Sequence, residues 1–138
     1  MNFKIQNIKV NGKNVAKVFK YQKKKFKGIN FFTSKFDNFQ VGLMVHPKNH
    51  IIKPHFHLNK KKTIKHMSEL LILFSGKLKV FFYNKNKSRA RSVTLNKKDM
   101  VLLMSGGHGF KVIENVEMLE VKQGPFFGDN DKIRLENI

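Results

Sequence analysis

Two histidines spaced by a single residue, His55 and His57, are the first feature of this sequence that could do chemistry. In a strand, alternate side chains share a face and lie about 7 Å apart, so both imidazoles would point the same way. In a helix the two side chains would diverge. The spacing therefore matters only in a β protein, and as an isolated pair the two residues could equally be exposed histidines on a polar edge.

Glu69 and His108 extend this pair to a possible ligand set. Alternation along the run Ser68–Phe74 places Glu69 on an otherwise apolar face, where burying an unpaired carboxylate costs roughly several kcal/mol. His108 follows a glycine-rich turn that can bring the backbone close to a bound group. Three neutral imidazoles and one carboxylate suit a divalent transition metal ion such as iron, manganese, nickel, copper or zinc.

Strands must position these residues, and the sequence predicts an all-β protein. Short apolar runs alternate with turn residues, and no long 3.6-residue periodicity is present. The expected strands are Phe3–Val10, Val15–Phe19, Phe39–Val45, His50–His57, Ser68–Phe74, Lys77–Tyr83, Arg89–Leu95, Met100–Met104, Gly109–Ile113 and Glu117–Lys122. Many short strands without a crossover helix predict one antiparallel sandwich or barrel.

Composition narrows the class of protein further. With 138 residues the chain can bury one core, and without cysteine it has neither disulfides nor thiolate metal sites. No stretch has the apolar length of a signal peptide or a membrane span, so we expect a cytoplasmic protein without membrane contact. The net charge of +19 comes mostly from scattered lysines, and only three residues are arginine. This pattern favours a solvated surface over a nucleic-acid interface.

The spacing of the candidate ligands resembles that of a known family. The segment His55–His57, followed by Glu69 and, after six residues, by Gly76, is similar to the first motif of the cupin superfamily, HxH…E-x6-G. The run Asp99–His108 resembles the second motif, which carries the fourth ligand. The resemblance implies a cupin-type jelly-roll β-barrel in which His55, His57, Glu69 and His108 bind one divalent transition metal ion.

The same resemblance implies how the single domain is organised. The barrel core would span about residues 38–124, preceded by strands within 1–37 that extend the sheet or form a dimer interface, and followed by a tail, 125–138. Between His57 and Glu69 the interval is longer than is common in cupins, which implies an inserted loop, residues 58–68, at the barrel mouth.

A narrower resemblance concerns the C-terminal region. Glu120–Phe126, with Asp131 and Lys132 beyond it, looks like the closing segment of small cupin metalloproteins of the WbuC type, which are associated with surface-polysaccharide gene clusters. This resemblance concerns the fold and the metal more than the reaction. A metal ion with four protein ligands keeps positions open for substrate oxygens, so we expect an isomerase, epimerase or oxygenase acting on a small polar or anionic metabolite, such as a sugar or sugar-nucleotide derivative. Two alternatives stay open: a non-catalytic cupin that binds a metal or metabolite, and a basic nucleic-acid-binding β-barrel.

Further side chains are candidates for binding the small-molecule ligand. They are His66, Lys53, Tyr83, Phe110, Lys122 and Gln123. His66 could also replace one of the metal ligands, since it lies three residues before Glu69. Each could instead be an exposed or a core residue. Because an unpaired edge strand such as Phe3–Val10 invites association, we also expect a homodimer.

Overall fold

The computed structural model describes residues 2–125 and 128–135 of the chain. Its elements are β1 (Asn2–Val10), β2 (Lys13–Gln22), β3 (Gly28–Phe31), β4 (Gly42–Val45), β5 (Glu69–Tyr83), β6 (Arg89–Asn96), β7 (Met100–Leu103), β8 (Gly107–Lys122) and the short 3-10 helix η1 (Gly128–Asp131). The prediction of an all-β protein is confirmed. None of the helices in the described ranges is long and apolar enough to cross a bilayer.

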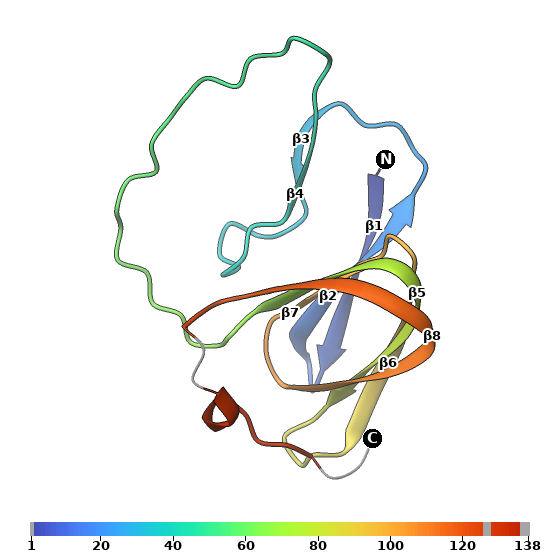
Figure 1. Cartoon of the computed structure of the whole chain (residues 1–138). Helices are drawn as coiled ribbons and strands as arrows, with labels where there is room; N and C mark the ends of the chain where they lie inside the picture. Colours follow the sequence, from blue (N-terminus) through green and yellow to red (C-terminus); the bar gives the residue numbers. More distant parts are fainter. Residues whose placement is uncertain (1, 126–127, 136–138) are drawn as a thin grey trace.

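Six of the strands form one antiparallel sheet that curls into half a barrel (Figure 1). The strand order is β1-β2-β7-β5-β6, and β8 pairs with the other edge of β5. β1 and β2 are joined by the turn Asn11-Gly12, where both residues have positive φ, as a tight hairpin requires. β3 and β4 form a separate two-stranded sheet beside the half-barrel.

β5 and β8 form a single ladder that bends in its middle. The sequence predicted two strands in each place, and the structure joins them, Ser68–Phe74 with Lys77–Tyr83 and Gly109–Ile113 with Glu117–Lys122. The register of the ladder shifts repeatedly on both sides of Gly76, which has a φ of 78°. Irregularities of this kind bend the strand that carries them. The break in the sequence pattern is therefore a bend within a strand and not its end.

The hydrophobic core fills the concave side of the curled sheet. It is built from alternate residues of the first two strands and of β5 to β7. Its fully buried side chains are Val18, Leu73, Leu78, Val80, Phe82, Leu95 and Val101, whereas Phe19 and Leu102, also fully buried, belong to a second cluster. A smaller cluster around Phe19 and Phe32 connects the two-stranded sheet to the half-barrel.

β8 has a strand on only one of its two edges. It pairs with β5 along its whole length, and within the described ranges no other strand lies beside it. Leu73 and Leu78 of β5 are 1% and 0% exposed, but their partners on β8, Met118 and Val112, are 41% and 54% exposed. Cross-strand partners share a face of the sheet. The fully buried core thus ends at β5; Phe110 and Val116 of β8 pack against it, but the inner face of β8 has only part of the cover that barrel closure would provide.

The long connection from β4 to β5 lies away from this open edge. Residues 46–68 contain no helix or strand, so the predicted strand His50–His57 is absent from this structure. Figure 1 shows the connection as a wide loop projecting from the half-barrel. Its apolar side chains have little cover: Phe56 is 98% exposed, and Ile51 and Leu58 are similarly open to solvent.

Candidate functional site

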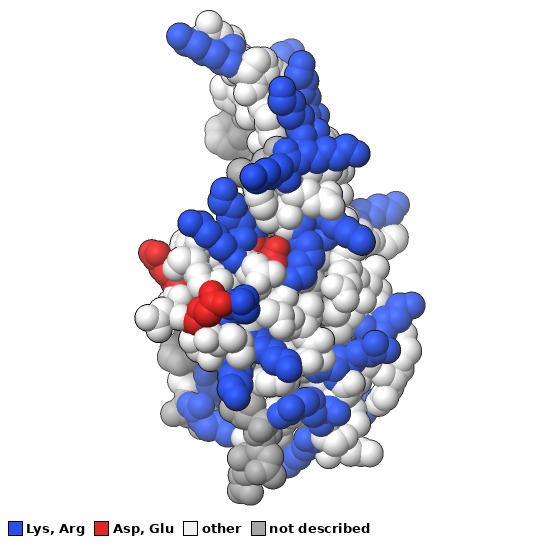
Figure 2. Space-filling view, turned by 90° about the vertical axis from the view of Figure 1, so that its right-hand side faces the viewer, with Lys and Arg blue, Asp and Glu red and all other residues white. Residues whose placement is uncertain are grey.

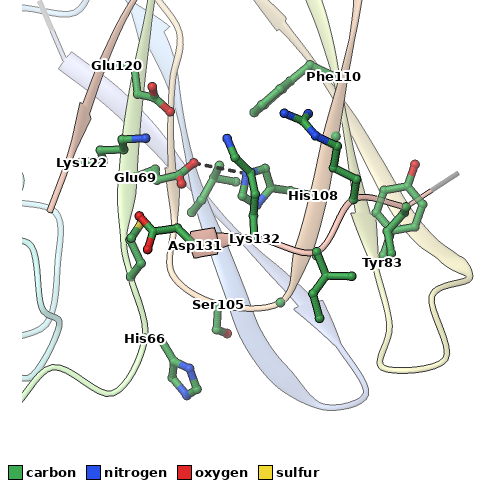
Figure 3. A pocket seen from close by; sticks show the side chains of 18 of the residues that line it. His66, Glu69, Tyr83, Ser105, His108, Phe110, Glu120, Lys122, Asp131 and Lys132 are labelled. Atoms are coloured by element: carbon green, nitrogen blue, oxygen red, sulfur yellow. Dashed lines mark ion pairs between the residues drawn. The ribbon is translucent and has the colours of Figure 1, made fainter. Parts of the chain in front are cut away.

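Glu69 and His108 form an ion pair on the inner face of the half-barrel. Glu69 begins β5 and lies opposite Lys122, whereas His108 lies opposite Phe82, so the two residues stand at opposite ends of the ladder. The bend at Gly76 folds the ladder back and brings its ends together. His108 Nε2 donates to Glu69 Oε2 across 3.2 Å (Figure 3). The sequence predicted both residues for one site, and the structure brings these two together.

The surroundings of Glu69 favour its ionised form. The hydrogen bond from His108 lowers the pKa of the Glu69 carboxyl below its ordinary value, against the opposite effect of partial burial. The positive charges of His108, Lys122 and Lys132 lower the pKa further. A carboxylate that stays ionised in acid is available as an acceptor or a cation ligand over a wide pH range.

We expect Glu69→Gln to reduce the stability of the metal-free protein by about 1 kcal/mol near neutral pH, because the side chains of the pair are partly exposed. The folded-state pKa is depressed, so the carboxylate stabilises the fold above its unfolded pKa of about 4.3. That stabilisation is lost as the pH falls through the lower, folded-state value. Urea unfolding between pH 3 and 7 should therefore show wild type and variant converging in acid.

The control for this experiment is Glu117→Gln, which removes an exposed carboxylate from β8. This variant should differ little from wild type throughout the same pH range. A difference in unfolding free energy between Glu69→Gln and wild type that stayed constant from pH 7 to pH 3 would contradict a stabilising role of the ionised carboxylate, because the difference would then be independent of ionisation.

A cavity of about 740 Å³ surrounds the ion pair. Its walls come from the ends of the folded ladder, the turn Ser105–Gly107, the end of the 46–68 connection and the C-terminal residues 131–135. Gly107 allows this close packing, since a Cβ there would lie 3.2 Å from Tyr83 Cβ and 3.8 Å from Leu135 Cδ1. The volume suits a small metabolite.

His55 and His57 do not lie in this cavity. Both are exposed on the projecting connection, with ring centroids 5.1 Å apart, and His55 Nδ1 lies 3.0 Å from the carbonyl oxygen of Lys53. In the described ranges, no three or more histidine, aspartate or glutamate side chains gather where they could hold a metal ion. This conformation therefore brings together two of the four predicted ligands and leaves the other two apart.

The six predicted ligand-binding residues divide in a similar way. Four line the cavity: His66, Tyr83, Phe110 and Lys122. Lys53 is exposed on the projecting connection. The side chain of Gln123 accepts a hydrogen bond from Ser68 N at 3.1 Å, so it fixes the start of β5 outside the cavity lining.

The sequence interpretation missed several charged residues of the cavity. Glu120 and Lys132 both line the cavity around the ion pair, and Figure 3 shows Glu120 near Lys122. Glu120 lies opposite Leu71 and so shares the inner face, which its position two residues before Lys122 could have indicated. Lys132 and Arg134 follow the last strand, where no periodic pattern shows the direction of a side chain.

Comparison with protein-family models, curated proteins and solved structures gave no match to this chain. The resemblance to cupins thus rests on the two sequence motifs. The geometry that bears on it is the contact between Glu69 and His108, which come from different motifs and lie 39 residues apart in the sequence.

Proposed function

We propose that this protein is a metal-binding cupin that acts on a small anionic metabolite, with His55, His57, Glu69 and His108 as ligands of one divalent transition metal ion. The observation that carries the proposal is the Glu69–His108 pair, which lies in a cavity beside β8, a strand whose outer edge has no strand partner among the described residues. In the described conformation these two donors are half of the ligand set. The proposal therefore includes a rearrangement in which the segment 50–58 adds to the free edge of β8 and completes the jelly roll.

The backbone groups of β8 and of the segment 50–58 support this strand addition. In the part of the chain that the structure describes, neither the outer edge of β8 nor the segment 50–58 has a strand partner for its N–H and C=O groups. Pairing the two would satisfy these groups, which is the basis of β-strand addition. Alternation puts His55 and His57 on one face, and the proposal requires the register in which this is the face of His108, with Phe56 on the outer face beside Ile113. Ile113 is 47% exposed in the open form.

The connection is long enough for this movement. Residue 69 lies next to β8, and the position beyond β8 is about 10 Å away, two strand spacings from β5. The ten residues between 58 and 69 span up to about 33 Å when extended. The segment can therefore reach the open edge while β5 stays in place.

The net charges of the two segments are opposite. Residues 46–67 carry six lysines and no acidic residue, and one of these lysines, Lys53, lies within the segment 50–58. β8 carries Glu114, Glu117 and Glu120 against Lys111 and Lys122, and Glu114 already pairs with Lys77. On the face seen in Figure 2, acidic side chains gather below the upper part, which is rich in lysine. Opposite charges on adjacent strands stabilise their pairing.

The proposed reaction class follows from the donor set. A divalent ion with four protein ligands keeps positions for substrate oxygens, and it would supply the Lewis-acid chemistry of an isomerase or epimerase, or the redox chemistry of an oxygenase. The chain's own residues would bind and orient the substrate. Lys122 would contact its anionic group, and Tyr83 and Phe110 would exclude water from one side of the cavity.

Metal analysis tests the proposal. Protein prepared without added metal should contain about one divalent ion per chain, and it should lose this ion as the pH drops below about 6, because protons compete for the imidazoles. Metal-free protein should also melt at a lower temperature than the loaded form. Failure to bind iron, manganese, nickel, copper or zinc at neutral pH would overturn the proposal.

A further inference from the structure

The C-terminal residues 131–135 form one wall of the cavity, although they belong to no strand. Asp131 ends η1, and residues 132–135 follow it. Leu135 lies near Gly107, because a Cβ built on that glycine would be 3.8 Å from Leu135 Cδ1. The end of this wall is therefore close to the residue that precedes His108.

Charged side chains of both signs line the cavity, and the basic ones outnumber the acidic ones by one. The basic residues of the lining are Lys65, Lys122, Lys132 and Arg134, and the acidic ones are Glu69, Glu120 and Asp131. The carboxylate of Glu69 is already occupied by its hydrogen bond to His108. Figure 3 shows Lys132 among the side chains around the ion pair, and its charge is one of those that lower the pKa of the Glu69 carboxyl. The C-terminal wall thus brings two cationic side chains, Lys132 and Arg134, and one carboxylate, Asp131, to the cavity.

We propose that residues 131–135 are an anion-binding clasp, in which Lys132 and Arg134 bind the phosphate or carboxylate group of a ligand seated over His108. A guanidinium and an ammonium two residues apart can donate several charge-assisted hydrogen bonds to one anionic group. The clasp uses the cavity of the proposed function, but it does not depend on a bound metal ion.

The rest of the lining indicates what the anionic group is attached to. Tyr83 and Phe110 line the same cavity, and a Cβ built on Gly109 would lie 3.6 Å from Tyr83 Cε2. Aromatic side chains of this kind pack against rings or the apolar faces of sugars. The ligand class is therefore a sugar-sized molecule with one terminal phosphate or carboxylate.

Calorimetry on chelator-treated protein tests the clasp with three probes: glucose 6-phosphate, glucuronate and glucose. Wild type should bind one or both of the charged sugars, and more tightly than glucose; the tighter of the two identifies the anionic group. The double variant Lys132→Gln/Arg134→Gln should bind that sugar at least about 10-fold more weakly, because two charge-assisted contacts are lost.

The matched control is Lys85→Gln/Lys97→Gln, which removes two charges from exposed turns outside the cavity. Its affinity for the charged sugars should stay within about 2-fold of wild type, the effect of a distant, screened charge. Equal losses of affinity in both double variants, or equal binding of the three probes by wild type, would overturn the proposal of an anion-binding clasp. The clasp variant should still bind one metal ion, so failure of this proposal is distinguishable from failure of the proposed function.

Discussion

Gly76→Ala is expected to leave the chain largely unfolded. A Cβ on Gly76 would lie 2.0 Å from the carbonyl oxygen of Asn115 and 2.7 Å from its carbonyl carbon. Both atoms belong to the backbone of β8, so the overlap is relieved only if the two strands separate. Positive φ at this position adds its own cost. We expect the free energy of unfolding to fall by more than about 4 kcal/mol, which is a large part of the stability of a domain this size.

Gly12→Ala is the matched control for this variant. Gly12 has a φ of 76°, close to that of Gly76, but a Cβ there would have nothing within 4 Å. Gly12→Ala should lower the free energy of unfolding by only about 1–2 kcal/mol, the usual penalty for a non-glycine residue in the left-handed region. Urea unfolding of both variants separates overlap from backbone strain. Equal losses of unfolding free energy in the two variants would contradict the close packing of the β8 backbone against Gly76, at the bend that brings Glu69 to His108.

His55→Ala/His57→Ala is expected to abolish tight binding of a divalent metal ion. The two substitutions remove half of the proposed ligand set, and disturbing residues that merely support metal ligands already costs about 10-fold to 100-fold in affinity. We therefore expect zinc affinity to fall by more than about 100-fold in calorimetry. Stability of the metal-free protein should change little, because both side chains are exposed.

His46→Ala/His50→Ala is the control for this effect. These histidines lie in the same connection, with their rings stacked at a centroid distance of 4.1 Å, and they are outside the proposed ligand set. This variant should keep the zinc affinity of wild type. Similar losses in the two double variants would indicate general binding by histidines of the connection and would contradict the assigned ligands.

The sequence predicted those features of the fold that depend on local patterns. Alternation and turn residues identified most strands, and the position of Glu69 among apolar residues predicted a partner for its carboxylate. His108 is that partner in the structure. The bend at Gly76 was not predicted, because a glycine between two apolar runs is typical of a turn, and only the continuous pairing with β8 distinguishes a bend from a turn.

Other features depend on contacts that no local pattern encodes. His50–His57 has the alternation of a strand, but a strand forms only where a neighbouring strand offers backbone partners, and no strand of residues 2–125 and 128–135 lies beside this segment. Lys132 reaches the cavity from beyond the last strand, so its role depends on the path of the C-terminal residues. The predicted metal ion, reaction and homodimer stay predictions.

The distance between the projecting connection and β8 shows whether the segment 50–58 adds to β8 when the metal ion binds. Because the chain contains no cysteine, Phe56→Cys/Lys111→Cys accepts spin labels at two exposed positions only. Double electron–electron resonance should show a long distance in metal-free protein and a short, narrow one after one equivalent of zinc is added, as the segment 50–58 pairs with β8. Stoichiometric zinc binding with an unchanged distance would contradict the account.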